Sequence, residues 1–169
     1  MQSKIRLLLA FTCALWLVPS IAAPLRVVME VSPPHQTNEQ GVPGGLTTAV
    51  VQEMLAHARL TSNIEVYPWA RAYKIASTTP DVLIYNMART SERENNFIWI
   101  GEVASYRFGF VKLKNRDDVQ IRNLADAKNY VAGTQRDDFS ADWLRSQGFT
   151  LGKQLTLQPD IEETWRYLV

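Results

Sequence analysis

Apolar and polar positions in the first half of the chain alternate between strand-like runs and helix-like spacing. The run Leu25 to Val31 is rich in β-branched residues and ends just before paired prolines, which predicts a first strand. Residues 41–45, with three glycines, are expected to form a loop. From Leu46 to about Arg59 the apolar positions recur at helical spacing, which predicts an amphipathic helix with Val50, Met54, Leu55 and Ala58 on its apolar side.

The same alternation continues to residue 85. Asn63 to Tyr67 is predicted to be the second strand, and Pro68 suits the first position of the helix that follows. Asp81 to Tyr85 is predicted to be a third, buried strand. Strand, helix, strand, helix and strand with short connections predict a parallel sheet flanked by helices.

A second α/β unit is predicted beyond Gly101, where the pattern is looser. The alternation from Tyr106 to Lys114 is sufficient for a strand. Asp160 is expected to cap the last helix, with Glu163 reaching back as in a capping box. The other elements expected here are a short helix near 123–127, a strand over 130–135, a helix over about 138–147 and a strand over 154–157.

The N-terminus has the layout of a secretory signal peptide. Lys4 and Arg6 precede the apolar run Leu7 to Val18, and small residues follow it, which favours cleavage after Ala22. A membrane anchor is the weaker interpretation, because the run is shorter than the ~20 residues of a span and Pro19 ends it. We therefore expect a signal peptide at 1–22, a first unit at 23–105 and a second at 106–169.

Composition narrows the possible functions of the mature chain. Cys13 is the only cysteine and lies in the signal segment, so the mature chain needs an ordinary hydrophobic core, which a 46% hydrophobic composition supports. Without Lys4 and Arg6, 16 basic residues face 17 acidic ones. This balance leaves no basic field for nucleic acid or a membrane surface.

Polar clusters follow the predicted strands. They are Pro34-His35, Tyr67 to Arg71, Asn86 to Arg93, and Arg136 to Asp138. Ligand crevices of open α/β sheets lie outside the carboxyl ends of the strands, and arginine can hold a carboxylate through two parallel hydrogen bonds. A single exposed arginine is more often a solvated charge, and the alternatives for Trp69 and Asp138 are a core residue and a helix cap.

No catalyst is predicted from these residues. His35 falls in a loop and His57 on a helix, without further ligands at metal-binding spacing. The sequence contains no nucleophile elbow, zinc helix motif or phosphate-cradling glycine loop. We therefore expect a binding protein without a cofactor or a metal.

These motifs together resemble the family 3 extracellular solute-binding proteins of the periplasmic amino-acid-binding type. The resemblance covers the whole mature chain and rests on Pro33-Pro34, Gly45-Leu46, the stretch Tyr67 to Tyr73, and Arg89 to Arg93 before Phe97. It implies a type II periplasmic binding fold of two α/β lobes with a strand hinge. It further implies a monomer in the periplasm that captures an amino acid or related carboxylate for an ABC permease.

The resemblance also implies roles for single residues. Thr90 and Arg93 match the family's threonine-x-x-arginine motif, whose arginine grips the ligand carboxylate, and Arg89 is left as a surface charge. Further ligand-binding residues are expected at Asn86, at Trp69 and Arg71 in the first lobe, and at Arg136 in the second. His35 stands where the family commonly has an aromatic residue and is also expected to bind the ligand.

Besides His35, the chain departs from the family pattern at its C-terminal end, and two rival functions remain open. The chain ends before the acidic residue for the ligand amino group and the returning hinge strand, so the second lobe is expected to be incomplete and the chain a C-terminally truncated fragment. One rival function is a periplasmic ligand-sensing domain of a signalling protein. The other is a dehydratase-like enzyme on the same fold, which turnover of a prephenate-like substrate would reveal.

Overall fold

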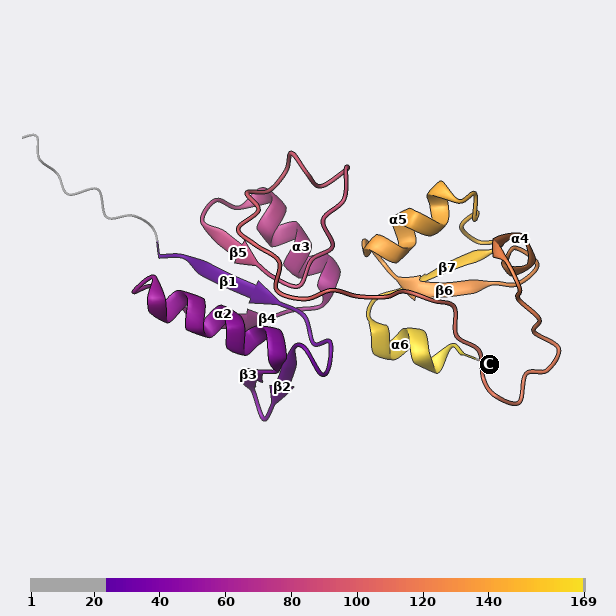
Figure 1. The fold of residues 1–169 in the computed structure, drawn as a ribbon, viewed down its shortest axis with the longest axis horizontal. Coiled ribbons are helices and arrows are strands. Elements are labelled where there is room, and N and C mark those ends of the chain that lie inside the picture. The colour runs from indigo at the N-terminus through magenta and orange to yellow at the C-terminus, as the bar shows by residue number, and fades with distance from the viewer. Residues whose placement is uncertain (1–23, 169) are drawn as a thin grey trace, which may run out of the picture.

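Two α/β units lie side by side along the long axis of the molecule (Figure 1). The structure is a computed structural model that describes residues 24–168. The expected signal peptide therefore lies outside the described residues. Within residues 24–168, no helix has the length and apolar character needed to cross a membrane.

The first unit is a three-stranded parallel sheet in the order β4-β1-β5, which confirms the prediction from the alternating pattern. Its strands are β1 (Arg26–Met29), β4 (Ile64–Val66) and β5 (Val82–Ile84). Helices α2 (Leu46–His57) and α3 (Trp69–Thr78) make the crossovers. Pro68 is the residue before α3, one position earlier than expected. The central strand β1 pairs on both sides, with Val27 opposite Ile64 and Leu83.

The core of the first unit lies between β1 and α2. Val27, Met29, Val51, Leu55 and Tyr85 form its buried cluster. The expected position of Val50 on the apolar side of α2 is wrong, since half of this residue is exposed to solvent. Two buried threonines take that place, and the Thr48 hydroxyl lies 2.9 Å from the Tyr85 hydroxyl. The buried face of α2 is thus partly polar, which its apolar spacing did not indicate.

A hairpin replaces the expected loop at residues 41–45. Strands β2 (Thr37–Glu39) and β3 (Val42–Gly44) pair antiparallel. Gln40 and Gly41 between them both have positive φ, at 52° and 86°, as two-residue hairpin turns require. Gly45 then starts α2 with φ 100°, and a Cβ there would lie 2.5 Å from the His35 carbonyl oxygen. Only glycine fits this close approach.

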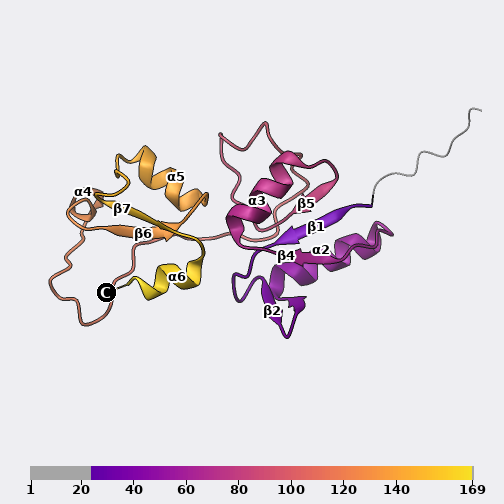
Figure 2. The same cartoon turned by 180° about the vertical axis from the view of Figure 1, so that it is seen from behind.

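The segment between the units is irregular, so the predicted strand from Tyr106 to Lys114 is wrong. Figure 2 shows it passing from the first unit to the second without joining either sheet. Its apolar residues alternate, but Phe108 and Val111 are each more than 60% exposed. Alternation alone does not make a strand, because the backbone also needs a partner for its hydrogen bonds.

The second unit contains two parallel strands, β6 (Ala132–Gln135) and β7 (Leu155–Gln158), with three short helices. The helices are α4 (Leu124–Ala127), α5 (Phe139–Ser146) and α6 (Ile161–Arg166). Asp138 and Asp160 cap α5 and α6 by accepting hydrogen bonds from Ser140 N and Glu163 N, as the sequence predicts for Asp160. The Glu163 carboxylate pairs with Arg166 instead of reaching back to the backbone of Asp160, so the expected capping box is not formed.

Leu155 is the central residue of a second, separate core. It is fully buried and clusters with Ala127, Leu144 and Phe149, none of which belongs to the core of the first unit. We expect Leu155→Ala to lower the opening free energy of the second unit by roughly 2–5 kcal/mol, because the cavity cannot be filled by its neighbours. Residue-resolved hydrogen exchange should show faster exchange in β6 and β7, with little change in β1.

The matched control is Val131→Ala, since Val131 is 64% exposed beside β6. It should leave the exchange rates within about 0.5 kcal/mol of the original chain. Equal acceleration of β1 and β6 by Leu155→Ala would show instead that the two cores unfold as one.

Candidate functional site

Arg93 is a buried cation in the loop after β5. It is 3% exposed, and a turn holds it, with Arg93 N donating to Thr90 O at 3.1 Å. Its guanidinium carbon lies 5.6 Å from the ring centroid of Trp69 and 5.0 Å from that of Tyr73, both on α3. The aromatic rings favour the cation through their negatively charged faces. The arginine and its aromatic wall thus follow the two strands, β5 and β4, that flank β1 in the sheet.

Two N–H donors of the first unit converge on one oxygen of the second. Arg93 Nη2 lies 3.0 Å from the carbonyl oxygen of Asp137, and Trp69 Nε1 lies 2.7 Å from the same atom. Asp137 connects β6 to α5 and has φ 58°, a left-handed conformation that aspartate adopts more readily than most residues. Three of the four polar clusters expected at strand ends therefore meet here.

Arg93 has two carbonyl partners and one carboxylate, Asp142, at long ion-pair distance. Arg93 Nη1 donates to the carbonyl oxygen of Ala88 at 3.3 Å. Asp142 Oδ2 lies 3.9 Å from Nη2, beyond hydrogen-bonding distance, and its side chain is about half exposed. A buried guanidinium held mainly by neutral carbonyls is suited to receive an anion.

A second polar contact joins the units at Glu30, the residue after β1. Gln135 Nε2 donates to Glu30 Oε2 at 2.8 Å. The pKa of Glu30 is raised to about 7, mainly by burial and also by the charges of Asp138 and Asp160, against the opposing effect of the hydrogen bond from Gln135. We call Glu30, Trp69, Arg93, Gln135 and Asp137 the junction.

Asn86 and His35 lie beside the connecting segment. Asn86 has φ 65°, donates from Nδ2 to Gln36 Oε1 at 2.9 Å and accepts a hydrogen bond from the Tyr106 hydroxyl. The His35 ring meets the Tyr106 ring edge-on, with centroids 4.8 Å apart. His35 Nδ1 is buried without a hydrogen-bond partner. Tyr106 thus links both expected ligand residues.

The side chains of Arg71 and Thr90 make their contacts away from the Arg93 guanidinium. Arg71 is exposed, and its guanidinium lies 4.4 Å from the ring centroid of Tyr67 on the outer surface of the first unit. The pKa of Glu92 is lowered first by a hydrogen bond from its own backbone and then by one from the Thr90 side chain. Arg89, predicted to be a surface charge, is exposed and paired with Glu94.

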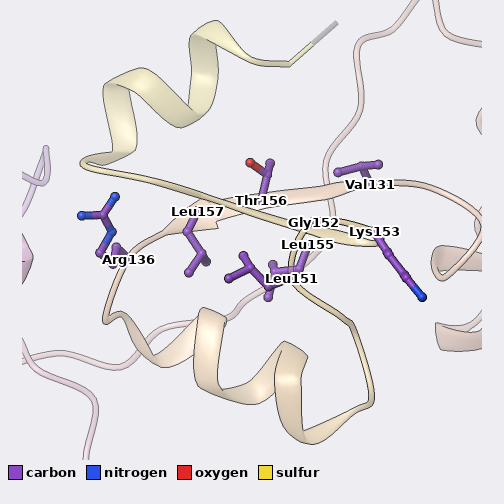
Figure 3. A pocket seen from close by; sticks show the side chains of 8 residues that line it. All are labelled: Val131, Arg136, Leu151, Gly152, Lys153, Leu155, Thr156 and Leu157. Carbon is purple, nitrogen blue, oxygen red and sulfur yellow. The ribbon is translucent and has the colours of Figure 1, made fainter.

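Arg136 lies at one end of a shallow hollow in the second unit. Figure 3 shows its side chain beside Leu157, with Lys153 at the opposite end. The side chain of Arg136 is exposed, and its backbone N–H donates to Gln158 O at 2.9 Å. It is the carbonyl of the next residue, Asp137, that reaches the first unit.

Sequence reasoning missed three members of the junction. Gln135 ends a predicted strand, Glu30 lies one residue before the end of another, and Asp137 takes part through its backbone. An acidic residue near the end of an apolar strand is the one available signal, at Glu30. No group of three or more His, Cys, Asp or Glu residues in the described part of the chain could hold a metal ion.

The indole N–H of Trp69 gives a direct readout of the junction. Trp69 is 3% exposed and donates across the units, whereas Trp143 and Trp165 are 40% and 56% exposed. We expect the Trp69 indole proton to exchange with water at least about tenfold more slowly than those of Trp143 and Trp165. Nitrogen-15 NMR would measure this, with Trp69→Phe to assign the signal. Equal exchange rates for the indoles of Trp69, Trp143 and Trp165 would contradict the contact.

Comparison with known proteins rests on structure alone. No model of a known protein family matches the chain, and no curated protein matches it in sequence.

Several solved structures are similar in fold. A histidine kinase sensor domain with similarity to periplasmic binding proteins has a TM-score of 0.66 at 17% identity, over 86% of this chain and 63% of that one. The GluR0 ligand-binding core of Nostoc punctiforme, in complex with L-glutamate, has a TM-score of 0.64 at 22% identity, over 86% of this chain and 64% of that one. The arginine-, lysine-, histidine-binding protein ArtJ of Geobacillus stearothermophilus has a TM-score of 0.64 at 15% identity, over 86% of this chain and 62% of that one.

The chain thus spans less than two thirds of the length of these three neighbours. Its α/β fold is that of the type II periplasmic binding proteins, as expected from the sequence.

Proposed function

We propose that the chain binds a small carboxylate-bearing solute, of the amino-acid class, between its two units. The observation that carries the proposal is the convergence of Arg93 Nη2 and Trp69 Nε1 on one oxygen, at 3.0 and 2.7 Å. Donors aimed at one point from two elements form a ready-made site for an oxygen acceptor. A solute carboxylate would take the place of the Asp137 carbonyl.

The physical chemistry favours this exchange. A carboxylate offers two oxygens to the planar guanidinium and brings the negative charge that the Asp137 carbonyl lacks. Hydrogen bonds between ionised partners are about twice as strong as neutral ones. Arg93 is already buried and oriented by its turn and two aromatic rings, so little side-chain entropy remains to be lost on binding.

The remaining expected residues take supporting roles in this proposal. Thr90 holds the turn that presents Arg93, through its backbone carbonyl. Asn86 and His35 line the side of the site near Tyr106, and Arg71 and Arg136 contribute charge at its outer margins. No catalysis, cofactor or nucleic acid is part of the proposed function.

We propose uptake as the purpose of binding, with a monomer in the periplasm that delivers its solute to an ABC permease. Structural similarity to amino-acid-binding proteins such as ArtJ supports this proposal. The similarity to a histidine kinase sensor domain favours a second candidate, a ligand-sensing domain. A membrane-spanning segment encoded in frame beyond residue 169 would favour sensing, and a neighbouring permease gene would favour uptake.

The test is calorimetry of the chain against a panel that contains L-glutamate, L-glutamine and L-arginine. Arg93→Gln should weaken the tightest of these roughly 10- to 100-fold, because it removes a charged donor to the carboxylate. The α-amide of the same amino acid should lose a similar factor with the unmodified protein, since it has no carboxylate charge.

The matched control is Arg89→Gln, which removes an exposed arginine from the same loop and should change the affinity less than about threefold. Near-ultraviolet circular dichroism would confirm that both variants are folded. Binding of the amide as tightly as the free acid, or tight binding by Arg93→Gln, would contradict the proposed role of Arg93.

A further inference from the structure

Glu30 is the acidic member of the junction, and its surroundings come from both units. Glu30 follows β1, the central strand of the first unit. Gln135 is the last residue of β6 in the second unit, and its Nε2 donates to Glu30 Oε2 at 2.8 Å. This is the reverse polarity of the Arg93 contact, in which the first unit donates and the second accepts. The two contacts together hold the units against one another.

The titratable groups near Glu30 are mostly acidic. Gln135, which contacts Glu30, pairs with Gln158 at the ends of β6 and β7, and Asp138 and Asp160 follow these two strand ends. Both aspartates destabilise the charged form of Glu30. The connecting segment contributes Tyr106, whose pKa is raised by burial and, to a smaller extent, by the charge of Glu30. The nearby His35 ring packs against Tyr106.

Neither aspartate is free to turn away from Glu30. The Asp138 carboxylate accepts from Ser140 N at 3.1 Å and caps α5, and the Asp160 carboxylate accepts from Glu163 N at 2.8 Å and caps α6. Rotation away from Glu30 would break a helix cap and destabilise the helix that it starts. Burial disfavours the Glu30 carboxylate most, and this repulsion adds to it. Both effects are relieved either by separation of the two units or by a proton on Glu30.

We infer that Glu30 is a proton-controlled latch between the two units, in which the neutral carboxyl favours the closed arrangement and the carboxylate favours separation. A neutral carboxyl keeps an acceptor oxygen for Gln135 and removes the repulsion from Asp138 and Asp160. The latch acts without a solute, so it does not depend on the proposed function.

The sign and size of the effect follow from linkage. The closed arrangement holds the proton with a pKa of about 7, and an exposed glutamate has an ordinary pKa of 4.5. The closed form therefore binds more protons between these values, and closure strengthens as the pH falls. The closing constant changes at most about tenfold per pH unit, and at most about 300-fold over the whole window.

The experiment is energy transfer between two fluorophores on the solute-free chain from pH 5 to 8. Exposed Gln52 on α2 and exposed Lys153 near β7 are replaced by cysteine in a Cys13→Ser background. The closed fraction should rise as the pH falls. Glu30→Gln, which cannot ionise and still offers an acceptor oxygen, should give a high closed fraction independent of pH.

Two further variants keep the inference falsifiable. Asp160→Asn keeps a helix cap but removes one repelling charge, so it should move the response to lower pH. Glu39→Gln, at an exposed site on β2, should behave like the unmodified chain. A flat response of the unmodified chain, or an unchanged response in Glu30→Gln, would overturn the inference, the latter by assigning the effect to His35 or His57. An unchanged midpoint in Asp160→Asn would overturn it as well.

Discussion

The convergence of Arg93 and Trp69 on the carbonyl oxygen of Asp137 is the interaction on which the arrangement of the two units depends. It joins two units that have separate cores and share one irregular connecting segment. Each hydrogen bond contributes only about 1 kcal/mol, or more for the charged donor. The closed arrangement is therefore weak enough for a competing oxygen to replace the carbonyl.

This weakness relates the fold to the proposed function. The parallel order β4-β1-β5 places Glu30, Trp69 and Arg93 at the carboxyl ends of neighbouring strands. The turn between β6 and α5 brings Asp137 to the same place from the second unit. A solute carboxylate and the Asp137 carbonyl would compete for the same donors. Glu30 would set how readily the units meet before any solute arrives.

Much of this site was predictable from the sequence because strand ends in a parallel sheet share one edge. The polar clusters after strands β4 and β5 were therefore expected to lie near one another, and Trp69 and Arg93 do. Asp137 was not predicted as a partner because it takes part through its backbone, which every residue has. Arg71 is two residues after Trp69, yet residues two apart on a helix face different directions, and Arg71 lies over the Tyr67 ring at the surface.

The fold was predictable where a strand-like sequence pattern also finds a partner strand, and not where the pattern occurs without one. The strands of the first unit follow their β-branched runs, whereas Tyr106 to Lys114 alternates without finding a partner strand. The hairpin turn at Gln40 and Gly41 was missed because its first residue is not one of those that usually adopt positive φ.

The most direct test of the proposed site is a crystal structure with the tightest-binding amino acid of the panel. We predict that the solute carboxylate accepts from Arg93 and Trp69 in place of the Asp137 carbonyl; a solute bound elsewhere, with the Arg93–Asp137 hydrogen bond intact, would contradict the account.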